Sequence, residues 1–222
     1  MKIDILTLFP EMFDGFLNTS IIKRALDNKY VDIKVHNFRD YSQDKHKRVD
    51  DYPYGGGAGM VLMCEPIFRA IESLKTKDTI TIMLTPAGKL FKQEIAQDLS
   101  NKKHIILLCG HYEGFDERIK TIVDMELSIG EYVLTGGEVP AMAITDAITR
   151  LIPGVITKES LDSESFTDNL LDYPNYTRPE VFRGMKVPEV LLSGHHKNIE
   201  EYRKEERIKM TDKHKTGGDN LE

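Results

Sequence analysis

The sequence places one guanidinium and several carboxylates near an expected domain junction, where they could act together as acid–base groups. Arg150 follows Asp146 by four residues on an expected helix, so the two could form an ordinary surface ion pair. Arg150 also ends that helix, where it could stabilise negative charge developing on a substrate. Asp162, Glu164 and Asp168 follow in a polar segment. Each is either a solvated linker residue or, if the segment folds over a cleft, a general base.

Three glycine-bearing segments could form a ligand cleft. They span residues 84–88, 109–114 and 129–138. Each alone could be a simple turn, because glycine permits tight geometry and close approach of other groups. In an open parallel sheet, ligands bind beyond the carboxyl ends of the strands. Three such segments converging on one sheet edge therefore predict a binding cleft.

The chemistry of these segments favours a small ligand over NAD or ATP. The pattern G-x-G-x-x-G does not follow the first expected strand, and G-x-x-x-x-G-K-[ST] occurs nowhere in the chain. The three segments also contain no lysine or arginine to face a polyphosphate. We expect backbone amides and carbonyls, with an apolar wall, to hold the ligand.

Residues 50–60 form the most glycine-rich stretch, with glycine at positions 55, 56, 57 and 59. The stretch could be a plain flexible hinge. The basic residues 46–48, together with Tyr52 and Tyr54, are typical of contact with a polyanion that carries stackable bases. The surrounding polar region 37–60 is too long for a mere connection, which favours a functional role.

The histidines and cysteines do not indicate a metal site. His111, His195 and His196 share no metal-ligand spacing with either cysteine, so a zinc centre is not expected. Cys64 and Cys109 are isolated in apolar or mixed segments. We expect both to be buried free thiols.

An α/β fold must position these residues. Hydrophobic periodicity predicts a helix opening at Pro10, strands at residues 3–9, 30–36, 79–84 and 105–109, and further helices at 20–28, 65–74, 90–99, 115–123 and 138–151. This alternation predicts a mostly parallel sheet with helices on both faces.

The alternation of apolar strand and helix patterns ends near residue 152. Residues 1–156 are expected to form one α/β domain, residues 157–169 a polar linker, and residues 170–222 a small helical C-terminal domain. In the last part, a basic helix is expected from about residue 198 to 210. The tail, residues 216–220, should fray.

The composition indicates a cytoplasmic protein but not its partner. The 222 residues are 40% hydrophobic, enough for a core, and the longest apolar runs are far too short to span a membrane. We expect no signal peptide. The net charge of −6 argues weakly against nucleic acid, yet residues 196–215 carry seven Lys/Arg against five Asp/Glu, and residues 44–48 are basic. A solvated face explains either segment equally well.

Longer motifs carry a resemblance to a known family. Residues 8–13 read Leu-Phe-Pro-Glu-Met-Phe, residues 50–60 Asp-Asp-x-Pro-Tyr-Gly-Gly-Gly-x-Gly-Met, and residues 112–118 Tyr-Glu-Gly-x-Asp-Glu-Arg. Residues 128–141 read Ser-Ile-Gly-x-Tyr-Val-Leu-x-Gly-Gly-Glu-x-Pro-Ala, and residues 171–179 Leu-Asp-Tyr-Pro-x-Tyr-Thr-Arg-Pro. Over nearly its whole length the chain resembles the bacterial tRNA (guanine-N1)-methyltransferases, which modify the guanosine immediately 3′ of the anticodon, at position 37.

The resemblance implies a deep trefoil knot in the α/β domain, an obligate homodimer with the active site at the subunit interface, and a C-terminal domain that binds tRNA. It implies S-adenosylmethionine as methyl donor, bound in the knot mostly by backbone hydrogen bonds to its adenine, and leaves open whether Mg²⁺ assists. The residues that match the family's cofactor site are Leu84, Thr85, Pro86, Gly110, Glu113, Ile129, Gly130, Glu131, Tyr132, Val133, Leu134, Gly136, Gly137 and Pro140.

The resemblance also assigns catalytic roles. Arg150 matches the family's catalytic arginine. Glu164 stands where the family usually has the aspartate of an Asp-Ser-Phe triplet, and Asp162 is the alternative base. On this hypothesis the carboxylate accepts the proton of guanine N1 while Arg150 offsets negative charge towards O6, and N1 then attacks the methyl group in line.

Contacts with tRNA are expected, by matching position, from Lys47, Arg48, Tyr54, Gly57, Gly59, Arg178, Arg183 and His196. The segment 45–48 and the side chains of Arg203, Lys204, Arg207 and Lys209 on the C-terminal helix would hold phosphates. The family's Gly-Asn-His near the end of the match reads Gly194-His195-His196 here, and the tail after it is short for the family.

Two other functions remain open on the sequence. A methyltransferase or nucleotide-binding enzyme for a small metabolite predicts activity on free guanosine nucleotides. A non-catalytic RNA-binding module predicts tRNA binding without cofactor binding.

Overall fold

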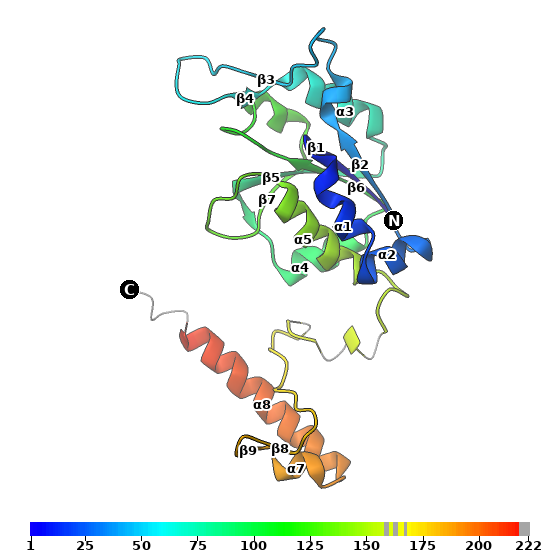
Figure 1. Ribbon diagram of the computed structural model, residues 1–222, viewed down its shortest axis with the longest axis vertical. Helices are drawn as coiled ribbons and strands as arrows, with labels where there is room; N and C mark the ends of the chain where they lie inside the picture. The colour runs from blue at the N-terminus through cyan, green and yellow to red at the C-terminus, as the bar shows by residue number, and fades with distance from the viewer. Residues whose placement is uncertain (158–159, 162–163, 167, 218–222) are drawn as a thin grey trace. The chain divides into compact units, whose positions relative to one another are not determined.

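The N-terminal part of the chain is built on a five-stranded sheet. In the computed structural model, which describes residues 1–157, 160–161, 164–166 and 168–217, all neighbouring strands of this sheet run parallel in the order β2-β1-β6-β5-β7. The strands are β1 (Lys2–Thr7), β2 (Asp32–Asn37), β5 (Thr79–Leu90), β6 (His104–Cys109) and β7 (Met125–Ser128), as Figure 1 shows. The predicted mostly parallel α/β sheet is confirmed.

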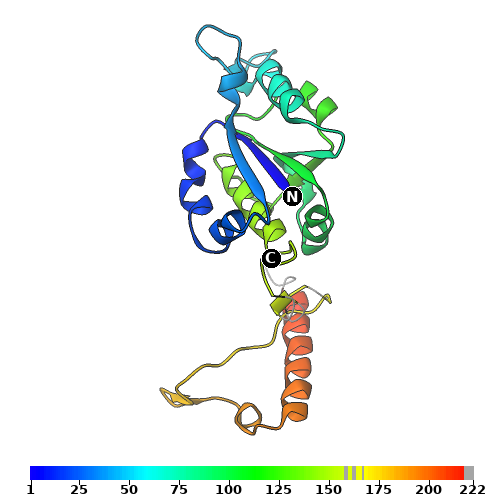
Figure 2. The same cartoon turned by 90° about the vertical axis from the view of Figure 1, so that its right-hand side faces the viewer.

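Helices pack on both faces of this sheet (Figures 1 and 2). One face carries η1 (Pro10–Phe13), α1 (Asp14–Leu17), α2 (Ser20–Asp27), α4 (Gln93–Ser100) and α5 (Glu138–Thr149). The other carries η2 (Phe38–Tyr41), α3 (Cys64–Leu74) and η3 (Glu117–Ile122).

Two apolar cores result because strand side chains alternate between the faces. Ile3 and Ile5 of β1 belong to the core under α2, α4 and α5, whereas Leu6 belongs to the core under α3. All six residues of β6, the central strand, are buried. A strand covered on both faces needs such a continuous apolar run, and this run is why the sequence predicts a strand at residues 105–109.

The prediction for residues 79–99 is wrong in part. β5 does not end at Leu84 but continues to Leu90, and residues 85–88 loop out of it, because Leu84 and Lys89 both pair with Leu127. The predicted helix starts later, at Gln93. Gly88 permits this irregularity, since a Cβ there would lie 2.5 Å from the backbone of Leu127. The four-residue edge strand β7 was not predicted.

Two other segments differ from the periodicity prediction. The helix expected at residues 115–123 is the shorter 3₁₀ helix η3, whose first turn is capped by the Asp116 carboxylate, which accepts a hydrogen bond from the Arg118 amide. Within the polar region 37–60, residues 50–51 form β3, which pairs antiparallel with β4 (Val61–Leu62). This small hairpin frames the glycine-rich stretch.

The chain divides into two compact units, Met1–Ile156 and Thr157–Glu222. The second contains β8 (Val181–Phe182), β9 (Met185–Lys186), α7 (Glu189–Leu192) and α8 (His196–Gly217). The predicted basic helix is therefore longer at both ends, and residues 216–217, predicted to fray, are helical. Inside this unit Arg207 donates to both carboxylate oxygens of Asp168, at 2.9 and 2.5 Å, and to the carbonyl of Leu171.

The two cysteines are free thiols, as predicted, although only Cys109 is fully buried. Burial raises the pKa of the Cys109 thiol well above its ordinary value. Within the described part of the chain, no helix combines the length and apolar character that crossing a bilayer requires.

Candidate functional site

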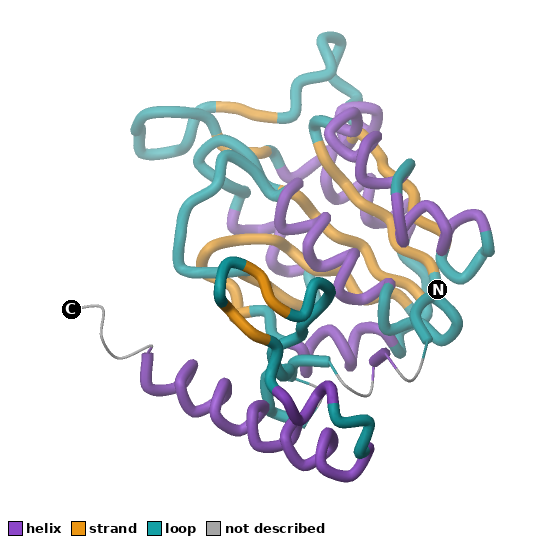
Figure 3. Tube along the Cα trace, turned by 60° about the horizontal axis from the view of Figure 1, so that its bottom comes forward, coloured by secondary structure: helices purple, strands orange, loops and turns teal. Residues whose placement is uncertain are grey.

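A cleft of about 350 Å³ lies at the carboxyl ends of β6 and β7 and beside the irregular part of β5. The three glycine-bearing segments of the sequence line it together. In Figure 3 the loops of this unit gather on the side away from the N-terminus. This is the edge at which an open parallel sheet binds ligands.

Thirteen of the fourteen residues predicted for the cofactor line this cleft: Leu84, Thr85, Pro86, Gly110, Glu113, Ile129, Gly130, Tyr132, Val133, Leu134, Gly136, Gly137 and Pro140. Glu131 does not line it. The structure adds lining residues that the prediction missed. His111, Tyr112 and Gly114 lie inside the second glycine segment and could have been included. Glu117 and Lys120 could not, because they come from η3.

Close packing between the second and third segments defines one wall of the cleft. The amide of Gly137 donates to the carbonyl of Gly110 at 2.9 Å. A Cβ on Gly137 would lie 2.6 Å from the Cα atom of Cys109, closer than real contacts allow. The chain after β7 therefore returns across the end of β6 before α5 begins, and glycine permits that crossing.

A buried carboxylate contacts His111, one of the residues that line the cleft. Glu138, the first residue of α5, is 1% exposed. Its Oε1 accepts a hydrogen bond from the Thr7 hydroxyl at 2.6 Å, and its Oε2 lies 2.8 Å from Nε2 of His111. The position at a helix N-terminus also favours the negative charge.

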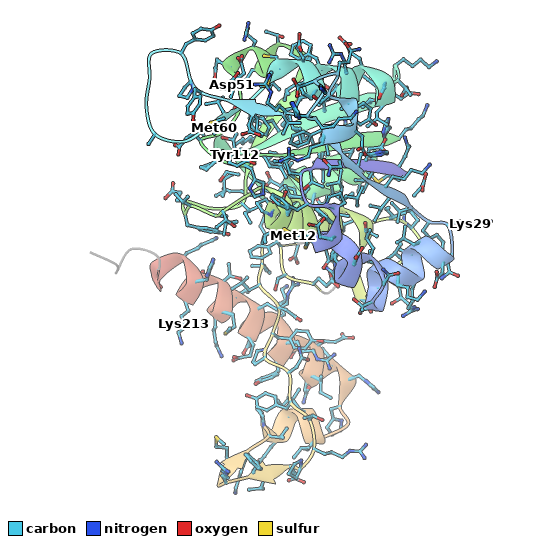
Figure 4. The ribbon with its side chains drawn as sticks, turned by 45° about the horizontal axis from the view of Figure 1, so that its top comes forward. Met12, Lys29, Asp51, Met60, Tyr112 and Lys213 are labelled. Atoms are coloured by element: carbon cyan, nitrogen blue, oxygen red, sulfur yellow. The ribbon has the colours of Figure 1, made fainter. Side chains whose placement is uncertain are left out.

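The second segment is hydrogen-bonded to the end of the glycine-rich stretch. The amide of Glu113 donates to the carbonyl of Met60 at 3.0 Å, and the amide of Leu62 donates to the carbonyl of Gly114 at 2.9 Å. In Figure 4, Asp51, Met60 and Tyr112 lie on one side of the unit, away from Lys29. The predicted RNA-contacting loop is thus attached to the rim of the cleft.

Charged side chains occur on the η3 side of the cleft. Lys120 and Glu117 both line it, and Lys120 Nζ lies 2.9 Å from Glu117 Oε1 and 3.7 Å from Glu126 Oε2. The hydrogen bond to Glu117 raises the pKa of Lys120. Nearby, the Arg118 guanidinium hydrogen-bonds the Asp116 carboxylate and holds its pKa well below the ordinary range.

The residues predicted for catalysis lie in different units. Arg150 forms the C-cap of α5, where it is half-buried and its amide donates to the Asp146 carbonyl at 3.1 Å. It is not among the residues that line the cleft. Glu164 belongs to the second unit and is half-buried, whereas Asp162 lies outside the described residues.

Asp168 is a weaker candidate for a base than the sequence suggested. The hydrogen bonds from Arg207 lower the pKa of its carboxyl, so the carboxylate holds its negative charge and accepts a proton less readily. The Arg207 guanidinium, predicted to hold a phosphate, is instead hydrogen-bonded to Asp168 of the same unit.

The predicted RNA contacts of the first unit lie on and beside the glycine-rich stretch. Tyr54 is fully exposed, and Gly57 and Gly59 have φ angles of +136° and +82°. Lys47 Nζ donates to the Ser42 carbonyl at 3.0 Å, and Arg48 pairs with Asp44 at 3.2 Å. That hydrogen bond from Arg48 lowers the pKa of Asp44 to about 2.

Most predicted RNA contacts of the second unit are exposed, whereas Arg207 is half-buried. Arg178 precedes a cis proline and lines a second cleft of about 470 Å³ within that unit. The Arg183 guanidinium lies 5.2 Å from the ring centre of Phe182, and His196 is the first residue of α8. In the same unit Arg203 stacks over Tyr173 at 4.7 Å.

Across the described residues, no group of three histidine, cysteine, aspartate or glutamate side chains is arranged to hold a metal ion. His111 is engaged with Glu138 instead.

Comparison with known proteins gives a consistent result. The family model described as tRNA (Guanine-1)-methyltransferase TrmD matches residues 1–217. A tRNA (guanine-N(1)-)-methyltransferase of Malacoplasma penetrans is 59% identical over 95% of this chain and 93% of the relative. Relatives of the same name from Ureaplasma urealyticum serovar 10 and Dictyoglomus turgidum are 56% and 57% identical, over 97% and 95% of this chain and 95% and 86% of their own lengths.

Proposed function

This chain belongs to the tRNA (guanine-1)-methyltransferase family, and from that premise we propose that it transfers a methyl group from S-adenosylmethionine to N1 of the guanosine immediately 3′ of the tRNA anticodon, at position 37. The observation that carries the proposal is the single cleft formed by three glycine-bearing segments at the carboxyl edge of the sheet.

The cleft has the size and chemistry that the donor requires. Its volume of about 350 Å³ lies in the range of small-molecule sites. Gly110, Gly136 and Gly137 leave backbone groups accessible along its wall, and Leu84, Ile129 and Leu134 supply apolar surface. Glu113 and Glu117 supply carboxylates to the lining, and because Glu117 is paired with Lys120, Glu113 is the carboxylate that suits a cation. When bound there, S-adenosylmethionine supplies an electrophilic methyl group on a positively charged sulfur.

The acid–base groups are proposed to act on the guanine. Glu164 accepts the proton of N1, which makes N1 nucleophilic. Arg150 donates hydrogen bonds towards O6 and offsets the negative charge that develops on the base. The active site is proposed to lie at the subunit interface of a homodimer.

The glycine-rich stretch is proposed to present the tRNA to the cleft. Its end is hydrogen-bonded to Glu113 and Gly114, and its exposed Tyr54 offers a ring on which an unpaired base can stack. Lys47 and Arg48 supply positive charge beside it. The remaining contacts are proposed to come from Arg178, Arg183 and His196 in the second unit.

We propose in addition a trefoil knot and a homodimer. The crossing of Gly137 over Cys109 and Gly110 supports a chain that threads back through the loops of the cleft. An exposed stripe on α5, which includes Val139 and Ala143, supports the dimer, because apolar side chains on a helix are ordinarily covered. A cytoplasmic location follows from the proposed tRNA substrate. Assistance by Mg²⁺ is a question for the assay.

The test is labelled methyl transfer to tRNA transcripts that carry either guanosine or adenosine immediately 3′ of the anticodon, with and without Mg²⁺. We expect 1-methylguanosine from the first transcript and no transfer to the second. Activity on free guanosine nucleotides would indicate a metabolite methyltransferase instead. Binding of tRNA with no binding of S-adenosylhomocysteine in calorimetry would indicate a non-catalytic RNA-binding module.

The proposed catalytic roles are tested by Glu164→Gln and Arg150→Ala. Each should lower kcat by about 100-fold or more, the usual effect of removing a general base or a charge-stabilising donor. Affinity for S-adenosylhomocysteine should change by less than about twofold, since neither side chain lines the cleft of its unit. Normal turnover by both variants would end this assignment.

A further inference from the structure

Four residues, one of which (His111) lines the cleft, form a closed ring of contacts. The Thr7 hydroxyl donates to Glu138 Oε1 at 2.6 Å, and Glu138 Oε2 accepts from His111 Nε2 at 2.8 Å. The His111 ring packs against Phe9 with 4.7 Å between ring centres. The Phe9 amide returns to the Thr7 hydroxyl oxygen at 2.9 Å, which closes the ring.

Burial makes this ring costly to break. Thr7 is 0% and Glu138 1% exposed, so neither group can replace a lost partner with bulk water. Each carboxylate oxygen of Glu138 has one of the two hydrogen bonds. Because a carboxylate only accepts, Nε2 of His111 must carry a proton, which fixes the tautomer or charge state of the imidazole.

The ring connects the segments that shape the cleft. Thr7 ends β1 and Phe9 lies two residues beyond it, His111 belongs to the second glycine-bearing segment, and Glu138 is the last residue of the third. Gly136 packs closely against the ring: an added Cβ would lie 2.2 Å from His111 Nε2 and 2.4 Å from Glu138 Oε2. Gly136, which lines the cleft, therefore packs directly against His111 and Glu138.

We propose that Thr7, Glu138 and His111 are positioning residues that hold the second and third segments at the separation the methyl donor needs. Thr7 and Glu138 act through His111 and through the backbone of the cleft. Their role is therefore in donor affinity and not in tRNA affinity. This inference rests on the proposed donor site.

The first test compares two substitutions of Thr7 in the full-length protein. Thr7→Val keeps the shape of the side chain but removes the hydroxyl. It should raise both the Kd for S-adenosylhomocysteine and the KM for the donor by roughly tenfold, the effect expected from losing about one charge-assisted hydrogen bond. Thr7→Ser keeps the hydroxyl and should stay within about twofold of the wild type. The KM for tRNA should not change in either variant.

Thr81→Val is the matched control. Thr81 is also fully buried in the sheet, but its side chain belongs to the face that carries α3, and among the described residues its hydroxyl has no hydrogen-bond partner. Its removal should leave donor binding unchanged. A Thr7→Val protein that melts at a lower temperature but binds S-adenosylhomocysteine like the wild type would show a merely structural role and overturn the proposal.

A spectroscopic test reports the ring directly. With ¹⁵N-labelled histidine, the signal of His111 should show a protonated Nε2 in the wild type and lose that signature in Glu138→Leu, which removes the acceptor. An unchanged signal in that variant would overturn the proposal. Failure of the wild type to bind S-adenosylhomocysteine would show that the proposed donor site is wrong. If the wild type binds it and the Thr7 and Glu138 variants bind it equally well, the donor site stands and the positioning role is wrong.

Discussion

At the scale of single residues, the third segment depends on the absence of side chains. Gly137 faces backbone atoms, with Cys109 Cα at 2.6 Å and the Gly110 amide nitrogen at 2.8 Å from an added Cβ. Backbone atoms of a central strand cannot move aside as the end of a flexible side chain can. Gly15 differs, because a Cβ there meets nothing within 4 Å among the described atoms.

Gly137→Ala should therefore reduce both stability and donor binding. Overpacking of this kind costs about 1–3 kcal/mol of unfolding free energy. The separation of the two segments must also increase, so S-adenosylhomocysteine should bind at least about tenfold more weakly. Urea unfolding and calorimetry measure the two effects. Gly15→Ala is the control and should be neutral or slightly stabilising, since alanine favours the helix in which it lies.

How far the site can be predicted from the sequence also depends on residue type. Glycines next to short apolar runs identify the three segments, because few other residues permit such close approach. Glu117 and Lys120 could not be predicted, since their place in the cleft depends on a 3₁₀ helix that periodicity does not distinguish from an α-helix. The pairing of Asp168 with Arg207 joins positions 39 residues apart, beyond any local pattern.

At the scale of elements, the edge of the sheet away from the cleft contains a second buried carboxylate. Asp4 on β1 is 0% exposed and accepts hydrogen bonds from Lys2, His36 and His104. His104 also contacts the Thr79 hydroxyl, so β1, β2, β5 and β6 share one polar network. Burial alone would raise the pKa of Asp4, but the hydrogen bonds outweigh it and hold that pKa below its ordinary value.

This network predicts a dependence of stability on pH. Since the pKa of Asp4 is lower in the folded than in the unfolded chain, its contribution is complete above the unfolded value of 3.8 and is lost as the pH falls below it. Asp4→Asn should cost about 3 kcal/mol at pH 7 and should flatten the decline in acid. Urea unfolding between pH 7 and pH 3 tests both. Asp32→Asn, at an exposed position of β2, should change little; an equal loss there would contradict the argument.

The elements themselves were predictable to the extent that their own residues carry a pattern. β6 is a continuous apolar run, and α3 shows a clear apolar face with Ile67, Ala70 and Ile71 buried. β7 has only four residues, and β8 and β9 are exposed two-residue strands, so pairing partners and not local sequence create them. In β5, proline and glycine hid the continuation of the strand past Leu84.

At the scale of the whole molecule, α5 has two different faces. Ala141, Ile144 and Ile148 pack into the core of the first unit. Val139 is 50% exposed, and Val133 in the preceding segment is 87% exposed. Exposed apolar side chains next to a ligand cleft are typical of a surface that a second subunit covers.

Val139→Asp should therefore convert the proposed dimer into monomers and abolish methyl transfer, because a charge is expensive to bury in an interface. Sedimentation velocity and the tRNA assay report the two outcomes. Gln97→Glu adds the same charge at an exposed position of α4 and should leave both unchanged. A Val139→Asp protein that remains dimeric would place the interface elsewhere.

The hydrogen bonds from Glu113 to Met60 and from Leu62 to Gly114 have one more consequence. They join the glycine-rich stretch proposed to contact RNA to a segment that lines the proposed donor cleft. A ligand that orders these hydrogen-bonded segments reduces the entropic cost of binding the other ligand. The coupling free energy is the same whichever ligand binds first. Substitutions in the glycine-rich stretch can thereby affect a cleft that residues 50–60 do not line.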